Sequence, residues 1–313
     1  MKKNHIPKAL YILIVVVFTL FTSCKGVEDS NVINNSNLEL FSISTELSNS
    51  SIKKKNKSKL SGLGISLVSW NIRDLGESKD ENEIYQIAQI LRDFDVIAIQ
   101  EVVAKDPKGA QAIAKIADYL NRMGSKWDYR ISDPTQSPSV YISERYAFLW
   151  KTSRIQMLNA AYLDNELANI CDREPFIGLF KHKKGNDPFW VVNFHSRRFD
   201  NHPEEEIKHF VAYPKRLQTN RVIIAGDFNL DEKHEVWQNF YASGFKNALS
   251  DSKTTLKLKC KNGSYTNHAI DNIFGSNGIS IFQSGKIDFV QDCESLKLAR
   301  EISDHLPVYI EFK

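Results

Sequence analysis

Cysteine and long apolar runs are scarce in this sequence. Its 313 residues include only 4 cysteines, and their scattered spacing argues against a zinc site built from cysteine thiolates. The N-terminal apolar run at residues 9–21 has 13 residues, which is short for a membrane span. No repeat and no second domain can be recognised, and the apolar share of 42% is ordinary for a globular protein. The sequence therefore favours one globular domain behind an N-terminal extension.

Net positive charge is also scarce outside the N-terminus. Residues 1–60 hold 9 of the 41 Lys and Arg residues and 4 of the 38 Asp and Glu residues. Residues 61–313 therefore hold 32 basic and 34 acidic residues, a formal charge of about −2. A domain that neutralises many phosphates through Lys and Arg would be more basic. This balance argues against a tight clamp on a polyanion but leaves room for a local basic patch or a bound metal ion.

The first 24 residues resemble an export signal. A basic segment, residues 1–8, precedes the apolar run, as in a signal peptide. Two small residues then precede Cys24, which resembles a bacterial lipobox, in which the cysteine is lipidated and becomes the mature N-terminus. We therefore expect export to a bacterial cell envelope and membrane anchoring through Cys24. Without lipidation, the protein would be secreted.

Residues 25–61 are rich in Ser, Asn and Lys and include KKKNKSK at 53–59. This composition predicts a flexible tether, followed by one catalytic domain at 62–313. Beyond Cys24, three cysteines remain, so an exported chain can form at most one disulfide among them. We expect Cys260–Cys293, a pairing that sequence spacing does not distinguish from the others.

Strand and helix patterns alternate along the domain. Apolar segments predict strands at 64–71, 95–101, 127–132, 146–150, 176–181, 189–194, 221–227, 269–275 and 306–312. Apolar spacing predicts helices over 81–94 and 109–123, and Pro203 followed by three glutamates predicts the start of another. Because several strand pairs lack an intervening helix, we expect an α+β sandwich with sheets in the middle and helices outside.

Polar residues recur where these predicted strands end. They are acids, amides and imidazoles: Asn71, Glu101, His195, Asp227, Asn229, Asp271, Asp304 and His305. A single Asp at a strand end is usually only a turn signal. Strand ends are rigid, however, and several of them can converge on one pocket. This many ends, nearly free of lysine, predict a functional site.

Part of this set suits a divalent metal ion. Oxygen ligands favour Mg²⁺, Mn²⁺ or Ca²⁺, and Mg²⁺ usually takes one or two carboxylates together with water and substrate phosphate. Glu101 and Asp304 are suited to that role. Asn71 and Asn229 can orient a phosphate or a water without adding negative charge.

The remaining residues suit proton transfer at a phosphodiester. His195 and His305 can move protons near neutral pH. Each needs a carboxylate to fix its tautomer, and Glu144 and Asp271 are candidates. Arg173 offers a forked donor for phosphate oxygens. Together with a metal ion, the set predicts metal-assisted phosphodiester hydrolysis.

Sequence motifs support this chemistry through a resemblance. In order, they are SWNIRDLGES, IQEV, SERYAFLW, REPF, VVNFHS, AGDFN, TNHAIDNIF and SDHLPV, and they span about residues 65–312. The chain resembles the endonuclease/exonuclease/phosphatase superfamily, in particular its secreted deoxyribonuclease I branch. GDFN with a terminal SDH is specific for the superfamily, whereas NIRDLGESK, SERY and REP point to the branch. The resemblance implies a four-layered α/β sandwich that cleaves phosphodiesters with a divalent metal.

The resemblance also implies residue roles at the metal. Glu101 of IQEV would be a metal ligand supported by Asn71 of WNIR. Asp304 of SDH would lie at the metal. Asp227 and Asn229 of GDFN would orient water and phosphate. Mg²⁺ or Mn²⁺ would serve catalysis, and Ca²⁺ would serve as a structural ion.

Two imidazole–carboxylate pairs are implied in the same way. His195 of NFHS would be a general acid or base paired with Glu144 of SERY. His305 of SDH would pair with Asp271 of IDNIF. Contacts with phosphate are implied for Arg173 of REP and Thr266 of TN.

The chain departs from the branch where the branch binds DNA. Tyrosines of the branch correspond to Ile142 and Ile270, although Tyr141 is adjacent to the first. An arginine that enters the minor groove corresponds to Val103. The cysteines that staple the loops of the branch are mostly missing: Glu232 or Lys233 and His268 stand near their positions. The resemblance thus implies an intact catalytic set on an altered DNA-binding surface.

We therefore predict an exported endonuclease that hydrolyses DNA with Mg²⁺ or Mn²⁺, and we infer no protein partner from the sequence. One alternative keeps the chemistry but changes the substrate to a phospholipid or another non-DNA phosphodiester, since the superfamily also includes sphingomyelinase-like members. Such members usually carry an exposed apolar lid or hairpin, and no such insertion is apparent in the sequence. A second alternative is a non-catalytic surface binding protein on the same scaffold. The complete set of acids, amides and imidazoles argues against it.

Overall fold

The computed structural model describes residues 60–76, 78–185 and 187–313. These residues all belong to one unit, Asn49–Lys313. The predicted signal peptide, Cys24 and nearly all of the predicted tether lie outside the described residues. Within the described ranges, every helix is too short or too polar to cross a lipid bilayer.

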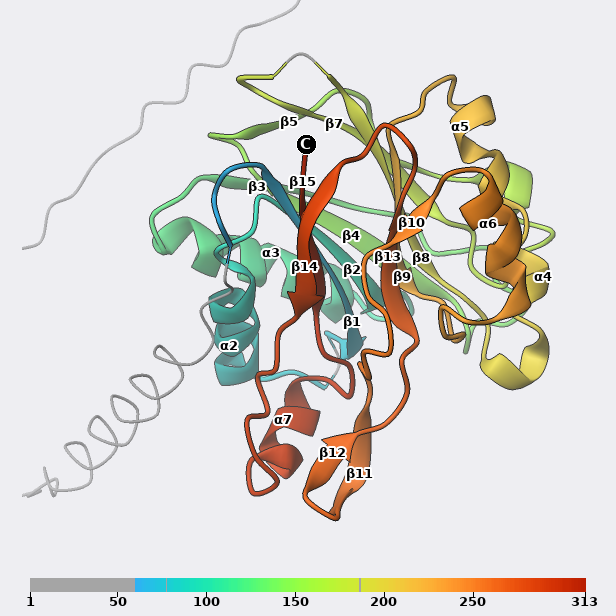
Figure 1. Cartoon of the computed structure of the whole chain (residues 1–313). Coiled ribbons are helices and arrows are strands. Elements are labelled where there is room, and N and C mark those ends of the chain that lie inside the picture. Colours follow the sequence, from blue (N-terminus) through green and yellow to red (C-terminus); the bar gives the residue numbers. More distant parts are fainter. Residues whose placement is uncertain (1–59, 77, 186) are drawn as a thin grey trace, which may run out of the picture. The chain divides into compact units, whose positions relative to one another are not determined.

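Two mixed β-sheets form the centre of the domain (Figure 1). The first sheet has the strand order β14-β15-β1-β2-β4-β3, in which β1 and β2 are parallel and the other neighbours are antiparallel. Its strands are β1 (Ile65–Leu75), β2 (Val96–Val103), β3 (Trp127–Ile131), β4 (Glu144–Lys151), β14 (Ile281–Lys286) and β15 (Val308–Phe312).

The second sheet has the order β10-β13-β9-β8-β7-β5, with β6 also paired to β7. Here β8 and β9 are the parallel pair. Its strands are β5 (Ile155–Met157), β6 (Tyr162–Leu163), β7 (Phe176–His182), β8 (Phe189–His195), β9 (Val222–Asp227), β10 (Lys246–Asn247) and β13 (Asp271–Gly275). A separate hairpin joins β11 (Leu256–Lys261) to β12 (Ser264–Thr266).

Helices cover the outer face of each sheet (Figure 1). The first sheet packs against α2 (Glu81–Leu91), α3 (Lys108–Arg122) and α7 (Leu296–Ile302). The second packs against α4 (Glu204–Ile207), α5 (Tyr213–Arg216) and α6 (Gln238–Ala242), with short 3₁₀ turns at Asn165–Leu167, Phe199–Asn201, Phe210–Ala212 and Glu235–Trp237. The predicted four-layered sandwich is therefore confirmed.

Three apolar cores hold the four layers together. In β1, Leu67 packs between the two sheets, whereas Val68 and Trp70 pack toward the helices. In β8, Val191 faces the other sheet and Val192 faces the helices. Strands buried on both faces need continuous apolar runs, which is the pattern seen in the sequence. The three cores, as far as the structure describes them, lie within the compact unit Asn49–Lys313, so a fragment of that unit contains each described core as a whole.

A buried amide pair joins the two sheets. Gln100 of β2 donates from Nε2 to Oδ1 of Asn193 in β8 at 2.5 Å. Asn193 in turn donates from Nδ2 to the carbonyl of Ile99 at 3.0 Å. Both amide side chains are fully buried, and buried amides that are hydrogen-bonded in this way favour one register of the sheets.

The helix predicted to start at Pro203 is present and short. It ends as α4 after four residues, and the chain continues through the turn at Phe210–Ala212 into α5. Pro214 explains the interruption, because proline has no amide hydrogen and its ring clashes with the preceding helical turn.

The sequence did not predict β14 or the β11–β12 hairpin, because their exposed polar residues weaken the apolar strand pattern.

The close approach of β8 and β9 gives a prediction for Gly226. A Cβ atom at this position would lie 1.7 Å from the carbonyl oxygen of Phe194. Gly226→Ala should therefore lower the free energy of unfolding by about 3 kcal/mol, measured by chemical denaturation. Gly263→Ala is the matched control, because that glycine has φ +73° but no atom near the added methyl, and it should cost only about 1 kcal/mol. Equal losses would show that the strand contact is not the cause.

Candidate active site

The strand ends converge at one end of the sandwich, beside α7 and the hairpin (Figure 1). The parallel pairs β1–β2 and β8–β9 end there, and the antiparallel strands β4 and β13 begin there. In the second sheet, Asp227 is the register partner of both His195 and Asp271. Strand direction and register therefore bring together side chains that are far apart in the sequence.

Asp227 lies at the centre of this group. Its Oδ2 atom is 3.2 Å from Nδ2 of Asn71, 3.6 Å from Nε2 of His195 and 3.8 Å from Nε2 of His305. Its Oδ1 atom accepts a hydrogen bond from the backbone amide of Asn229 at 3.0 Å. Burial and the neighbouring charge of Asp271 raise the pKa of Asp227. The structure thus brings both predicted histidines to one carboxylate.

His195 is held by Glu144, as predicted. Nδ1 of the ring lies 2.9 Å from Oε2 of Glu144, and Nε of Arg173 lies 3.0 Å from the same oxygen. Burial disfavours the charged ring, but the Glu144 carboxylate outweighs this effect and raises the pKa of His195. Burial also opposes the charge of Glu144, but His195 and Arg173 lower its pKa. The ring is therefore oriented with Nε2 toward Asp227.

His305 is held by Asp271 in the same manner. Nδ1 of His305 lies 2.9 Å from Oδ2 of Asp271. Burial again disfavours the charged ring, but Asp271 and Asp227 raise the pKa of His305 to about 10. The hydroxyl of Thr254 donates to Oδ2 of Asp271 at 2.6 Å and fixes the carboxylate. The two imidazole–carboxylate pairs therefore face each other across Asp227.

Glu101 and Asn71 form the side of the cluster that belongs to the first sheet. Nδ2 of Asn71 donates to Oε1 of Glu101 at 2.9 Å. Glu101 has φ 60°, at a point where the pairing of β2 with β4 shifts register, so the bulge sets the direction of its carboxylate. Oδ1 of Asn71 is buried and accepts no hydrogen bond within the described residues.

Asp304 lies between two arginines. Its Oδ2 atom is 3.6 Å from Nη1 of Arg73 and 3.4 Å from Nη2 of Arg300.

The trio of Asp227, Asp271 and His305 has possible metal-ligand atoms that all lie within 4.8 Å of one another. The cluster therefore offers two groupings for a cation, Glu101 with Asn71 and the trio just named, whereas Asp304 contacts the two arginines.

The two predicted phosphate contacts differ from the rest of the set. The guanidinium of Arg173 contacts Glu144 and also donates to the carbonyls of Ile142 at 3.2 Å and Ser196 at 3.1 Å. These contacts use Arg173 to hold Glu144 and the neighbouring backbone in place. Thr266 lies in β12, opposite Leu256. Within the described ranges, its side chain makes no hydrogen bond to the cluster.

Several supporting residues were missed by the sequence analysis. Ser303 donates from Oγ to the carbonyl of Asn71 at 2.7 Å, and the hydroxyl of Tyr146 accepts from the backbone amide of His195 at 3.1 Å. Ser303 belongs to the quoted SDH motif and could have been identified from it. Tyr146 and Thr254 gave no such signal, because their contacts join distant parts of the chain.

A cleft of about 270 Å³ opens beside the cluster. Its polar lining includes Glu101, Glu144, Arg173 and His195. Its rim includes Val140 and Tyr141, whose exposed fractions are 73% and 91%. The cleft therefore combines the His195 half of the cluster with an exposed apolar rim.

The pKa of His305 gives a prediction for stability. A pKa raised from about 6.5 in the unfolded chain to about 10 means that the charged ring stabilises the fold fully below pH 6.5. This contribution should fall by up to about 1.4 kcal/mol per pH unit and be lost as the pH passes 10. The measurement is urea denaturation in EDTA of the 49–313 fragment and its His305→Asn variant. Their difference in unfolding free energy should shrink across this window, and a constant difference would contradict the assignment.

Known proteins similar to this chain include nucleases. A deoxyribonuclease from Thioalkalivibrio sp. (strain K90mix) is 28% identical over 266 residues, covering 79% of this chain and 70% of the relative. Deoxyribonuclease-1 of Bos taurus is 28% identical over 274 residues, covering 80% of this chain and 92% of the relative.

A solved structure with the same fold is an endonuclease/exonuclease/phosphatase family protein from Bacteroides thetaiotaomicron. It has a TM-score of 0.57 and 17% identity and covers 80% of this chain and 97% of that chain. The relatives and the fold together support a hydrolase of the nuclease or phosphodiesterase kind. The endonuclease/exonuclease/phosphatase family matches residues 68–305, and the chain belongs to that family.

Proposed function

We propose that this protein is an exported, metal-dependent endonuclease that hydrolyses DNA phosphodiester bonds. The observation that carries the proposal is the pair of carboxylate-held imidazoles whose Nε2 atoms lie 3.6 and 3.8 Å from one oxygen of Asp227. Hydrolysis of a phosphodiester needs one group to take a proton from water and another to give a proton to the leaving oxygen. Two oriented imidazoles at one point meet that need.

The two histidines take different parts in this proposal. The raised pKa of His305, about 10, keeps its ring protonated near neutral pH, which suits donation of a proton to the leaving oxygen. His195 accepts a proton from the attacking water at Nε2, and Glu144 stabilises the imidazolium that forms. Asp227 orients the water between the two rings. As the water oxygen bonds to phosphorus, the bond from phosphorus to the leaving oxygen breaks.

The residues of the first sheet fit a divalent cation. Oδ1 of Asn71 is a buried oxygen that finds no hydrogen-bond donor among the described residues, and it belongs to the amide that also contacts Glu101. Such an unpaired oxygen beside a carboxylate is suited to Mg²⁺ or Mn²⁺. Glu101, Asn71 and Asp304 would hold the ion. When bound, the ion supplies positive charge that stabilises the phosphate in the transition state.

Other features support DNA as the substrate and export as the destination. The curated relatives are named deoxyribonucleases, and Tyr141 at the rim of the cleft offers an exposed aromatic ring to a base or sugar. Cys260 and Cys293 form a disulfide, as predicted, and Cys171 is free and buried. Disulfides are typical of exported proteins, which agrees with the signal peptide and the Cys24 anchor proposed from the sequence.

A lipid phosphodiesterase is the second candidate function. It is favoured by three exposed apolar side chains at the active-site end, those of Val140, Tyr141 and Leu258, which a membrane could accommodate. Val140 and Tyr141 are adjacent in the sequence, but Leu258 is far from both. The three residues therefore do not form a long apolar lid. DNA therefore remains the substrate that we propose.

The catalytic prediction concerns plasmid nicking. The 49–313 fragment with Mg²⁺ should nick supercoiled plasmid, and EDTA should stop the reaction. His195→Ala and His305→Ala should each lower the rate by a factor of roughly 10² to 10⁴, because proton transfer is lost. His182→Ala is the matched control: His182 ends β7, which is antiparallel to β8, so it lies at the opposite end of the sheet from His195.

Two outcomes would count against the proposal. Near-normal nicking by both histidine variants would show that the acid–base assignment is wrong. Hydrolysis of sphingomyelin without plasmid nicking would replace DNA with a lipid substrate.

The metal prediction separates the two groupings of oxygen ligands. Glu101→Gln should raise the Mg²⁺ concentration needed for half-maximal nicking by at least about tenfold, because a ligand loses its charge. Asp271→Asn should instead lower the maximal rate, since it removes the partner of His305. Titration of nicking with Mg²⁺ measures both quantities. The reverse pattern would place the ion at the Asp227–Asp271–His305 group.

A further inference from the structure

The β11–β12 hairpin is a basic segment in an acidic domain. Residues 252–270 contain four lysines and no Asp or Glu, whereas residues 61–313 as a whole are slightly acidic. The lysines are Lys253, Lys257, Lys259 and Lys261. Figure 1 shows the hairpin projecting from the active-site end of the molecule.

The base of the hairpin adjoins the catalytic residues. The amide of Leu256 donates to the carbonyl of Asp304 at 2.7 Å, and the amide of Leu306 donates to the carbonyl of Thr254 at 2.7 Å. Arg300 adds a hydrogen bond from Nη1 to the carbonyl of Leu256 at 2.6 Å. From this base, the six residues of β11 extend roughly 17 Å at about 3.3 Å per residue. The hairpin therefore begins at the cluster and leads away from it.

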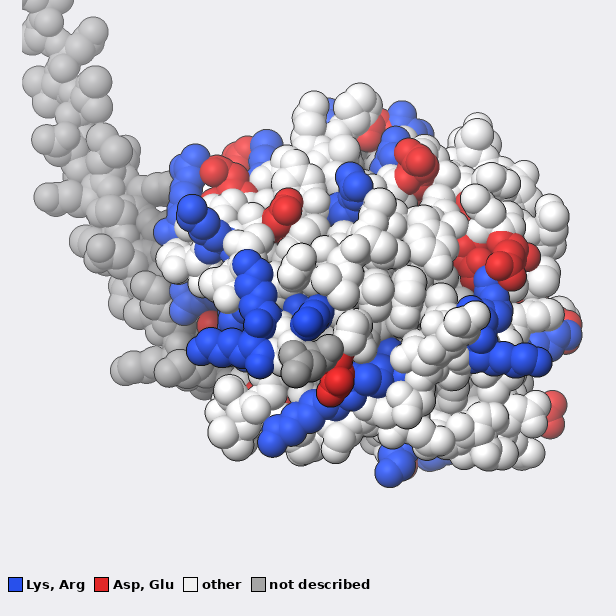
Figure 2. Space-filling model, turned by 90° about the horizontal axis from the view of Figure 1, so that it is seen from above, with Lys and Arg blue, Asp and Glu red and all other residues white. Residues whose placement is uncertain are grey.

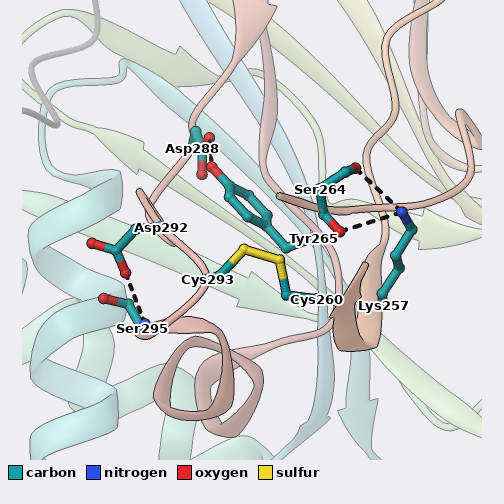
Figure 3. The surroundings of a disulfide bond; sticks show 8 residues. All are labelled: Lys257, Cys260, Ser264, Tyr265, Asp288, Asp292, Cys293 and Ser295. Atoms are coloured by element: carbon teal, nitrogen blue, oxygen red, sulfur yellow. Dashed lines mark hydrogen bonds between the residues drawn. A yellow bond between two sulfur atoms is a disulfide. The ribbon is translucent and has the colours of Figure 1, made fainter. Parts of the chain in front are cut away.

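The outer half of the hairpin is stapled in place (Figure 3). The Cys260–Cys293 disulfide ties β11 to the segment before α7. The hydroxyl of Tyr265 donates to Oδ2 of Asp288 at 2.5 Å, and Nζ of Lys257 donates across the hairpin to Oγ of Ser264 at 3.2 Å. These links hold the strands in one position before any substrate arrives, which lowers the entropy cost of binding.

The exposed groups of the hairpin suit an anionic backbone. Lys259 and Lys261 are exposed, and the tip at Asn262–Gly263 is polar and exposed. Leu258 is the one exposed large apolar side chain between Leu256 and Thr266. A tip of this composition is unsuited to insertion into lipid, whereas lysines are suited to phosphate. The opposite end of the domain exposes Lys and Arg side chains together with Asp and Glu (Figure 2).

We propose that the β11–β12 hairpin is a preorganised arm that binds the phosphate backbone of a nucleic-acid substrate through Lys259 and Lys261, several nucleotides from the bond that is cleaved. Duplex DNA rises about 3.4 Å per nucleotide, so an arm of roughly 17 Å spans about five phosphates of one strand. This inference rests on the proposed nuclease function. The arm would supply a local basic contact, although residues 61–313 as a whole are slightly acidic.

The test measures binding and cleavage separately. Binding of a fluorescein-labelled DNA duplex is followed by anisotropy over a salt series, in Mg²⁺, with the 49–313 fragment carrying His195→Ala to prevent cleavage. Adding Lys259→Gln and Lys261→Gln should weaken binding roughly tenfold at low salt and reduce the slope of log K against log salt by about 1.8, since each phosphate contact contributes about 0.9. Lys183→Gln with Lys184→Gln is the matched control, because both lysines are exposed just after β7, at the far end of the sheet.

The catalytic readout uses His195 intact. The ratio of plasmid cleavage to hydrolysis of bis(p-nitrophenyl) phosphate should fall in the Lys259/Lys261 variant, because the small diester has no backbone beyond the reacting phosphate. Replacing Cys260 and Cys293 with Ser should weaken duplex binding while the salt slope stays the same, since the lysines remain. A salt slope in the Lys259/Lys261 variant equal to that of the parent would refute the arm. Failure of the unmodified fragment to cleave plasmid would instead refute the proposed nuclease function.

Discussion

The buried carboxylate of Asp227 is the contact on which the active site depends. It accepts a hydrogen bond from Asn71 of the first sheet and lies within 4 Å of the imidazoles of His195 and His305. A buried carboxylate is unfavourable unless donors or cations surround it. The fold meets this requirement by closing the two sheets around one oxygen. The close approach of β8 and β9 at Gly226 places the carboxylate where both sheets can reach it.

Rigidity around this point comes from a shell of polar contacts. Glu144 and Asp271 fix the two rings. Behind them, Thr254 donates to the carboxylate of Asp271, and Ser303 donates to the backbone carbonyl of Asn71. Beneath them, the Gln100–Asn193 amide pair locks the sheets together. Groups that are oriented before the substrate binds need no reorganisation during the reaction. The site therefore derives its geometry from the strand ends that carry Asn71, Glu101, Glu144, His195, Asp227 and Asp271, together with the α7–β15 connection that carries His305.

Membership of the endonuclease/exonuclease/phosphatase family accounts for chemistry on a phosphate ester. Which substrate binds depends on the surfaces around the site. Two such surfaces are distinctive here. The rim with Tyr141 is exposed and apolar, and the stapled hairpin with Lys259 and Lys261 is basic. Their combination near one reacting centre matches a polymer with bases and a charged backbone better than a small phosphate ester.

The sequence by itself predicted an α+β sandwich and the strand ends that carry polar groups, and its motifs, through a family resemblance, implied the four layers and the two imidazole–carboxylate pairs. Apolar runs and local motifs carry this information because each depends on residues close together in the chain. Only the tertiary structure decided which atoms meet. The position of Asp227 between both rings, the unpaired oxygen of Asn71 and the engagement of Arg173 with Glu144 all depend on strand register. The hairpin was missed because exposed lysines hide its strand pattern, and its place beside Asp304 depends on contacts between segments almost 50 residues apart.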